Sequence, residues 1–261
     1  MLNIFNRLPQ MLLGLPAILL SLSIHESAHG YVAYKLGDPT ARNLGRITLN
    51  PLKHINIYGL ISMIFFNIGW ANPVPIRSRN FKNPRKGMAL SAIAGPASNL
   101  ALAITFTILL RIIMIPLNKM APEGTYLYRE IDASTYQYYL APQLMENITF
   151  VVLSLIAVML YLGIGLNLNL MFFNMIPLPP LDGSRIAFIF LPTDTYFKIM
   201  QYERYIMIGF VVLLATGIVS LPLGYLTNGV SDILFKSTGM PKDLLMAIVG
   251  KIFNSLPQLS F

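Results

Sequence analysis

Four stretches of the chain are apolar and long enough to cross a lipid bilayer, and they limit the possible folds more than any other feature. They cover about residues 9–36, 87–117, 147–176 and 205–226. A helix needs roughly 20 apolar residues to cross the hydrocarbon core. Only 11% of the residues are charged, whereas soluble domains carry about 25%. We expect a mainly α fold, a polytopic transmembrane helical bundle. It forms a single domain over residues 1–261, with a core at 9–200 and a C-terminal span and amphipathic tail at 203–261.

The first apolar stretch has an alternative interpretation as a signal peptide, because Arg7 precedes it. No cleavage motif of small residues follows, and the apolar character continues past Gly30. We therefore interpret this stretch as a membrane span.

A shorter apolar segment, residues 59–70, would extend only about 18 Å as a helix, which is too short to span comfortably. Basic residues flank it on both sides between positions 35 and 86. If the segment crossed the bilayer, one basic cluster would be translocated, against the positive-inside tendency. We expect a re-entrant or interfacial segment, with residues 45–50 and 72–76 extended on either side. A short fifth spanning helix remains the alternative.

This choice predicts an outside N-terminus, with residues 35–86 and 177–204 inside and 118–146 outside. Five tyrosines of the outer loop are expected to form an interfacial belt rather than a binding cage; they are Tyr126, Tyr128, Tyr136, Tyr138 and Tyr139. The net charge of +8 is expected to face anionic lipid rather than nucleic acid. We predict a multi-pass protein of the cell membrane, whose tail at 243–256 lies along the surface. The sequence does not give the oligomeric state.

Two histidines lie four residues apart, in His25-Glu-Ser-Ala-His29. This is H-E-x-x-H, the helix signature of zinc metalloproteases. Residues i and i+4 share a helix face, so both imidazoles can bind one metal, while Glu26 can contact water without ligating. The alternative is a pair of buried histidines satisfied by carbonyl groups. Three ionisable side chains in an apolar helix are costly unless they serve a site, which favours the metal.

A catalytic zinc usually takes three protein ligands, and the chain has no cysteine. The spacing of one soluble subclass fails, because it requires Gly at Val32 and His at Lys35. The best candidate is Asp182, in the segment 174–183, where three prolines break the helix. The predicted topology places Asp182 at a depth similar to that of the histidines. Read alone, Pro-Pro-Leu-Asp-Gly is a turn signal.

With these motifs together, the chain resembles the site-2 protease family of intramembrane zinc metalloproteases, in its short prokaryotic type without a PDZ domain. The resemblance rests on residues 25–29, on Gly-Pro-Ala-Ser-Asn at 95–99 and on residues 174–183, supported by 50–54 and 69–75. It implies one catalytic Zn²⁺ held by His25, His29 and Asp182, with Glu26 as the general base. It also implies substrate-binding roles for Asn99 and Asn174, and a membrane-associated β-hairpin between the first and second core helices.

The sequence departs from the family pattern at two places outside the proposed zinc ligands. Family members often have Asp-Pro where this chain has Asn56-Ile57, and Lys where it has Asn72. We interpret His54 as an ordinary interfacial residue. Asn99 has an alternative role as a packing residue that hydrogen-bonds between helices.

The predicted function is an intramembrane zinc metalloendopeptidase. It would cleave a transmembrane-helix protein close to the cytoplasmic face, after the substrate unwinds and pairs with an edge strand from residues 45–50 or 72–76. The alternatives are a metal transporter and an inactive relative that binds helices. A transporter would need carboxylates in several spans, and an inactive relative should have lost Glu26.

Overall fold

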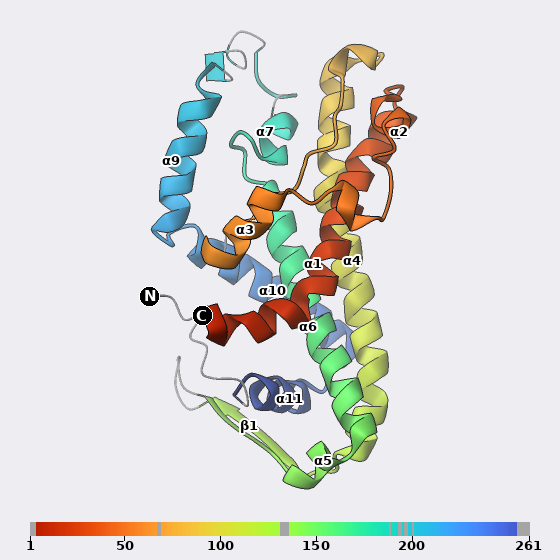
Figure 1. Ribbon diagram of the computed structural model, residues 1–261, viewed down its shortest axis with the longest axis vertical. Helices are drawn as coiled ribbons and strands as arrows, with labels where there is room; N and C mark the ends of the chain where they lie inside the picture. Colours follow the sequence, from red (N-terminus) through yellow and green to blue (C-terminus); the bar gives the residue numbers. More distant parts are fainter. Residues whose placement is uncertain are drawn as a thin grey trace. The chain divides into compact units, whose positions relative to one another are not determined.

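Long helices dominate the computed structural model, which describes residues 4–66, 69–130, 136–187, 189–192, 195, 198–199 and 201–254. The three longest are α1 (Ile4–Lys35), α4 (Pro84–Met120) and α6 (Ile148–Asn174) (Figure 1). By length and composition, Met11–Lys35, Pro84–Met120 and Ile148–Asn174 can each cross a membrane. The mainly α-helical fold with membrane-spanning helices is therefore confirmed.

The fourth predicted span is not one continuous helix. The chain forms α9 (Glu203–Ala215) and α10 (Ser220–Thr238), with a turn between them. Gly217 in this turn has φ +75°, a left-handed value that suits glycine and interrupts a right-handed helix. Pro222 lies in the first turn of α10, where its missing N–H is tolerated. The prediction of an unbroken helix over 205–226 is wrong because apolar composition alone does not register such a break.

The small β-hairpin lies elsewhere than the family resemblance implied. Strands β1 (Tyr126–Glu130) and β2 (Tyr136–Leu140) pair antiparallel, with Tyr128 opposite Tyr138. Between α1 and α4, the described residues show only an isolated bridge from Ile55 to Ala71. The intervening α3 (Ile57–Phe66) has 10 residues, about 15 Å at the usual helical rise. This length fits the re-entrant or interfacial interpretation; residues 67–68 lie outside the described part of the chain.

The described structure comprises two compact units. The first takes residues 1–18, 103–165 and 231–261. It contains the hairpin, the short α5 (Pro142–Glu146) and α11 (Lys242–Asn254), which packs against both strands. Leu244, Leu245 and Ile248 of α11 are fully buried. Protein therefore covers the apolar side of the tail that we expected at the membrane surface, while residues 255–256 lie outside the described range.

The second unit takes residues 19–102 and 166–230 and holds every predicted site residue. Short helices connect α1 to α4, namely α2 (Thr40–Asn43), the 3₁₀ helices η1 (Pro51–Lys53) and η2 (Ser78–Asn80), and α3. The proline-rich segment after α6 leads to α7 (Asp182–Ala187). Asn167 Nδ2 on α6 donates to Ser21 Oγ on α1 at 2.8 Å, which joins two apolar helices by a polar contact.

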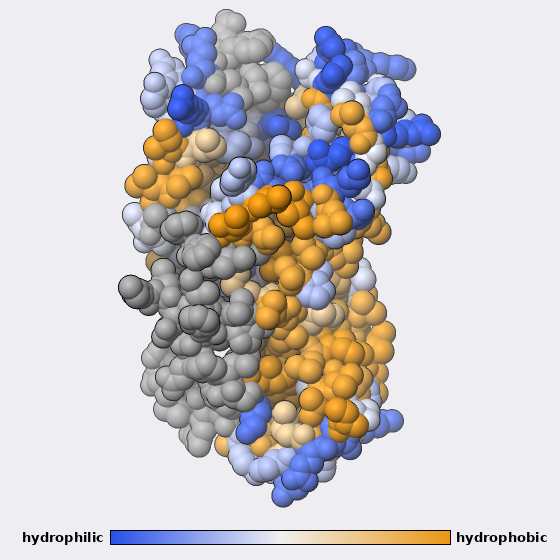
Figure 2. Space-filling view, viewed as in Figure 1, coloured by the Kyte–Doolittle hydropathy of each residue, from blue (hydrophilic) through white to orange (hydrophobic). Residues whose placement is uncertain are grey.

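Apolar side chains face outward along the long helices. Figure 2 shows a broad hydrophobic surface there. Exposed members on α4 are Ile104, Ile108, Leu109, Ile112 and Ile115, and those on α6 are Ile148, Val152, Leu155 and Ile156. So large an exposed apolar surface marks an interaction site or a lipid contact, and lipid suits helices of this length.

Candidate metal centre

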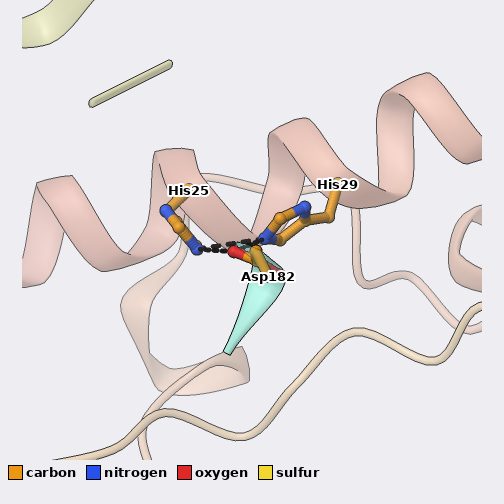
Figure 3. Close-up of side chains that lie close together, drawn as sticks. All are labelled: His25, His29 and Asp182. Carbon is orange, nitrogen blue, oxygen red and sulfur yellow. Dashed lines mark hydrogen bonds and ion pairs between the residues drawn. The ribbon is translucent and has the colours of Figure 1, made fainter. Parts of the chain in front are cut away.

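The three predicted metal ligands meet at one point. His25 and His29 project from successive turns of α1, and Asp182 begins α7 (Figure 3). Asp182 Oδ2 lies 3.3 Å from His25 Nε2 and 3.1 Å from His29 Nε2. The two Nε2 atoms are 3.0 Å apart. Residues separated by more than 150 positions therefore converge as the sequence predicted.

In each imidazole the hydrogen bond at Nδ1, the outer nitrogen that faces away from Asp182, determines which nitrogen carries the proton. His25 Nδ1 lies 2.8 Å from Asn99 Oδ1, and His29 Nδ1 lies 2.7 Å from the backbone oxygen of Ser91. Both oxygens can only accept, so both Nδ1 atoms donate and both Nε2 atoms present lone pairs. Partners of this kind commonly orient metal-binding histidines.

The donor set fits a zinc ion. Bonds of 2.0–2.1 Å at tetrahedral angles would separate ligand atoms by roughly 3.3–3.4 Å, close to the three separations observed. Asp182 Oδ2 is buried, with no hydrogen-bond donor among the described residues. Two lone pairs and an ionised oxygen facing one another call for a cation between them.

A glycine in α4 makes room for this arrangement. A Cβ atom at Gly95 would lie 2.4 Å from His29 Nε2 and 2.6 Å from His25 Cε1. Real Cβ atoms do not approach so closely, so any other residue would displace the imidazoles or the helix. The same helix supplies Ser91 and Asn99, which bind the outer nitrogens. The Gly-Pro-Ala-Ser-Asn motif is therefore part of the support for the ligands.

Glu26 faces the same cavity without touching the ligand group. Its Oε2 accepts a hydrogen bond of 2.9 Å from the backbone N–H of Val74. The cavity, of about 130 Å³, is lined by Glu26 and the three ligands together with Pro73, Val74, Ile76, Asn174, Pro180 and Arg185. The residue predicted as general base and the three predicted ligands thus line one cavity.

The two asparagines predicted to contact substrate occupy different positions. Asn99 is fully buried behind His25 and does not line the cavity, so the structure shows the helix-to-helix hydrogen bond that was its alternative role. Asn174 lines the cavity, and its Nδ2 donates to the Leu170 carbonyl at 2.9 Å.

His54 is not the interfacial residue that we expected. It is only 1% exposed, and its Nε2 donates to the Thr48 carbonyl at 2.9 Å. Ser27 Oγ of α1 donates to the same oxygen at 2.7 Å. The interfacial prediction is wrong because these contacts bury His54 between the loop and the helix that carries the ligands.

Sequence reasoning offered residues 72–76 as an edge for the substrate but did not place Val74 and Ile76 beside the predicted ligands, and it missed Arg185 as a cavity residue. Arg185 follows Asp182 by three positions, a spacing that places both on one face of a helix, and this signal was available in the sequence. The positions of Val74 and Ile76 depend on contacts between distant residues, which no local pattern reveals.

Comparison with known proteins agrees with this geometry. The model of the family described as peptidase family M50 matches residues 13–216. The chain belongs to peptidase family M50. The resemblance to site-2 proteases is therefore confirmed, and the matched range contains all six residues predicted for the site.

Two M50-like relatives carry names that agree with the family. The chain is 36% identical over 239 residues to "Putative zinc metalloprotease YwhC" of Bacillus subtilis (strain 168), covering 92% of this chain and 91% of that protein. It is 34% identical over 91 residues to "Putative zinc metalloprotease Rip2" of Mycolicibacterium smegmatis, covering 33% and 35% of the two chains. No solved structure matches the chain significantly. Membership of a membrane-embedded zinc metalloprotease family thus accords with both the apolar helices and the ligand group.

Proposed function

We propose that this M50 protein is an intramembrane zinc endopeptidase that cuts transmembrane-helix proteins near the cytoplasmic face of the cell membrane. The observation that carries the proposal is the meeting of two imidazoles, a buried carboxylate and Glu26 around one cavity. Three of these four residues lie in a helix that is apolar enough to span a bilayer.

The residues divide the chemistry among them. His25, His29 and Asp182 would hold one zinc ion. Such an ion supplies Lewis-acid polarisation of the scissile carbonyl and activation of a water molecule. Glu26 takes a proton from the attacking water as its oxygen bonds to the carbonyl carbon. Glu26 then returns that proton to the amide nitrogen as the C–N bond breaks, leaving a carboxylic acid and an amine.

The substrate must present an extended backbone, because an intact helix hides its peptide bonds and the cavity is small. Residues 72–76 suit pairing with such a backbone. They contain no helix or turn, and the Ile76 N–H and Val74 carbonyl have no backbone partner within the described residues. The prediction that residues 45–50 are also extended is wrong, because they form a turn at Gly45 and a bend over 47–49. We therefore favour the 72–76 segment as the edge that an unwound substrate joins.

Arg185 is the cation that this cavity offers to the substrate. Within the described part of the chain its guanidinium has no ion pair or hydrogen bond, although Asp182 and Glu26 line the same space. It is therefore available to a peptide carbonyl as negative charge develops there. Replacement by glutamine is expected to lower kcat/KM roughly tenfold or more without loss of zinc.

The metal-transporter alternative has less support. The three candidate spans contain a single acidic residue, Glu26, whereas intramembrane ion pathways usually use several ionisable groups. Among the described residues, one His-His-Asp group could hold a metal. An inactive helix-binding relative is disfavoured because both Glu26 and the ligand group are present.

A reconstituted cleavage assay tests the proposal. The zinc-loaded protein and Glu26→Gln would be placed in liposomes with a panel of single-span substrates, and the fragments mapped by mass spectrometry. We expect cuts near the cytoplasmic end of the substrate helix by the wild type, and a loss of at least about 100-fold in rate in Glu26→Gln, with zinc retained. Equal rates for the two proteins would remove Glu26 from the mechanism. No cleavage across the panel by zinc-loaded wild type would count against a protease.

A further inference from the structure

One backbone hydrogen bond orients the proposed general base. The N–H of Val74 donates to Glu26 Oε2 at 2.9 Å, and no other donor reaches this carboxylate within the described residues. The other oxygen, Oε1, is left to accept a proton. A carboxylate fixed at one oxygen has less rotational freedom, so its second oxygen is held in a defined direction.

The local sequence allows only one donor at this place. Pro73 and Pro75 flank Val74, and proline has no backbone N–H. The prolines also restrict φ on both sides of Val74. The short run Pro73-Val-Pro75 therefore presents a single N–H on a stiff backbone, and this N–H points at Glu26.

Side chains fix both ends of residues 72–77, which we call the strap. At one end, the Asn72 N–H donates to the His54 carbonyl at 2.7 Å, and Arg46 Nη2 donates to the Asn72 carbonyl at 2.7 Å. At the other end, the Arg77 N–H donates to Asp38 Oδ2 at 2.6 Å. Asp38 is fully buried. The strap is thus anchored two residues before Val74, at Asn72, and three residues after it, at Arg77.

The strap also packs directly on the helix that carries Glu26. Gly30 lies one turn beyond Glu26 on α1, and a Cβ atom there would lie 3.1 Å from Val74 Cγ1 and 3.0 Å from Ala41 Cβ. Val74 itself is 6% exposed. The missing side chain at Gly30 lets the strap approach closely enough for the Val74 N–H to reach the carboxylate.

We propose that the strap is a positioning element for catalysis, in which the Val74 N–H aims the Glu26 carboxylate at the reacting water. Val74 acts through Glu26 and needs no contact with the metal ligands. The proposal rests on the proposed protease function, because it assigns a role within that reaction.

A pair of substitutions at one position tests the role of the N–H. Val74→Pro removes the N–H, whereas Val74→Ala removes most of the side chain and keeps the N–H. In the zinc-loaded full-length protein we expect Val74→Pro to lower kcat by about 100-fold, within the usual range for general-base catalysis. Both variants alter the same residue of the substrate-facing segment, so KM and zinc content should be similar in the two, while kcat should fall at least about tenfold further in Val74→Pro than in Val74→Ala. Equal kcat values for the two variants would overturn the proposal.

A double-mutant cycle separates positioning from general damage. Glu26→Asp shortens the side chain so that it no longer reaches Val74. In that background Val74→Pro should change kcat by less than about threefold, because coupled residues are not additive. A second full 100-fold loss would show that Val74→Pro acts by disturbing the fold, and would contradict the positioning role.

Gly30→Ala provides an independent variant should Val74→Pro fail to fold. The added methyl group must push the strap by a few tenths of an ångström, and we expect kcat to fall by about tenfold with zinc retained. An unchanged kcat would contradict the inference. If the wild type itself cleaves nothing, the proposed function fails; if it cleaves and these variants match it, only the role of the strap fails.

Discussion

The metal-ligand group and the strap face the same cavity, but different forces hold them in place. The ligands lie on helices α1 and α7, and a third helix, α4, binds the outer nitrogens of both histidines. The strap has no regular structure and depends on side-chain hydrogen bonds at its two ends. Changes in the first region should therefore alter metal binding, whereas changes in the second should alter catalysis with the metal still bound.

Removal of a ligand should give the largest effect. Asp182→Ala takes away the anionic donor of a three-ligand group, so we expect zinc affinity to fall by at least about 100-fold and proteolysis to disappear. Zinc content after purification and titration with a competing chelator would measure this. Asp232→Ala is a suitable control, because Asp232 pairs with Lys242 at the surface of the other unit. Full zinc occupancy in Asp182→Ala would exclude Asp182 from the ligand set.

Gly95→Ala should cause the second-largest loss of zinc affinity, because it introduces a steric clash without removing a metal ligand. The new Cβ would lie 2.4 Å from His29 Nε2, so α4 or the imidazoles must move. We expect a loss of zinc affinity of roughly 10–100-fold, similar to that caused by disturbing the partners of metal ligands. Gly209→Ala is a matched control in α9, since a Cβ there has open space. Similar zinc binding by the two variants would contradict the close packing.

Substitution of Asn99, the hydrogen-bond partner of His25, should lower zinc affinity less. Two variants distinguish the loss of its acceptor oxygen from the loss of its side-chain volume. Asn99→Ala removes the acceptor for Nδ1–H, and we expect about a tenfold loss of zinc affinity. Asn99→Asp keeps an acceptor oxygen in a similar volume and should bind zinc better than Asn99→Ala. The reverse order in a zinc competition assay would indicate that the Asn99 amide, rather than its oxygen, supports the site.

Substitution of Asp38 should have the smallest effect on zinc binding, because Asp38 binds the strap and not the metal. It therefore tests the difference between the strap and the metal-ligand group. Burial raises the pKa of Asp38, but hydrogen bonds from Thr40, Arg77 and Asn80 outweigh burial and lower this pKa below its ordinary value. Its contribution to stability is thus present above the unfolded pKa of about 3.9 and is lost as the pH falls through the lower folded pKa.

Thermal unfolding of the wild type and Asp38→Asn at several pH values would measure that contribution. We expect the wild type to be more stable at pH 6, and the difference to shrink as the pH falls below about 4. Both proteins should bind equal zinc at neutral pH. A difference that grew in acid would show that the Asp38 carboxylate does not stabilise the fold.

The spacing of residues along the sequence was enough to predict those features of the site that lie within one helix or at its end. The interval between His25 and His29 places both on one face of α1, and prolines before Asp182 mark the end of α6. The features that failed depend on distant contacts. Apolar composition did not reveal the break at Gly217, and nothing near His54 in the sequence indicates that Thr48 and α1 bury it. The close approach of Gly95 to two imidazoles likewise becomes visible only when α1 and α4 are packed together.

The shared support of the two histidines by α4 has a further consequence. One support is the side chain of Asn99 and the other is the main chain at Ser91, so substitution can remove the first but not the second. A displacement of α4 along α1 would nevertheless turn both rings at once. We therefore expect any change in the packing of these two helices to alter the affinity for the cation.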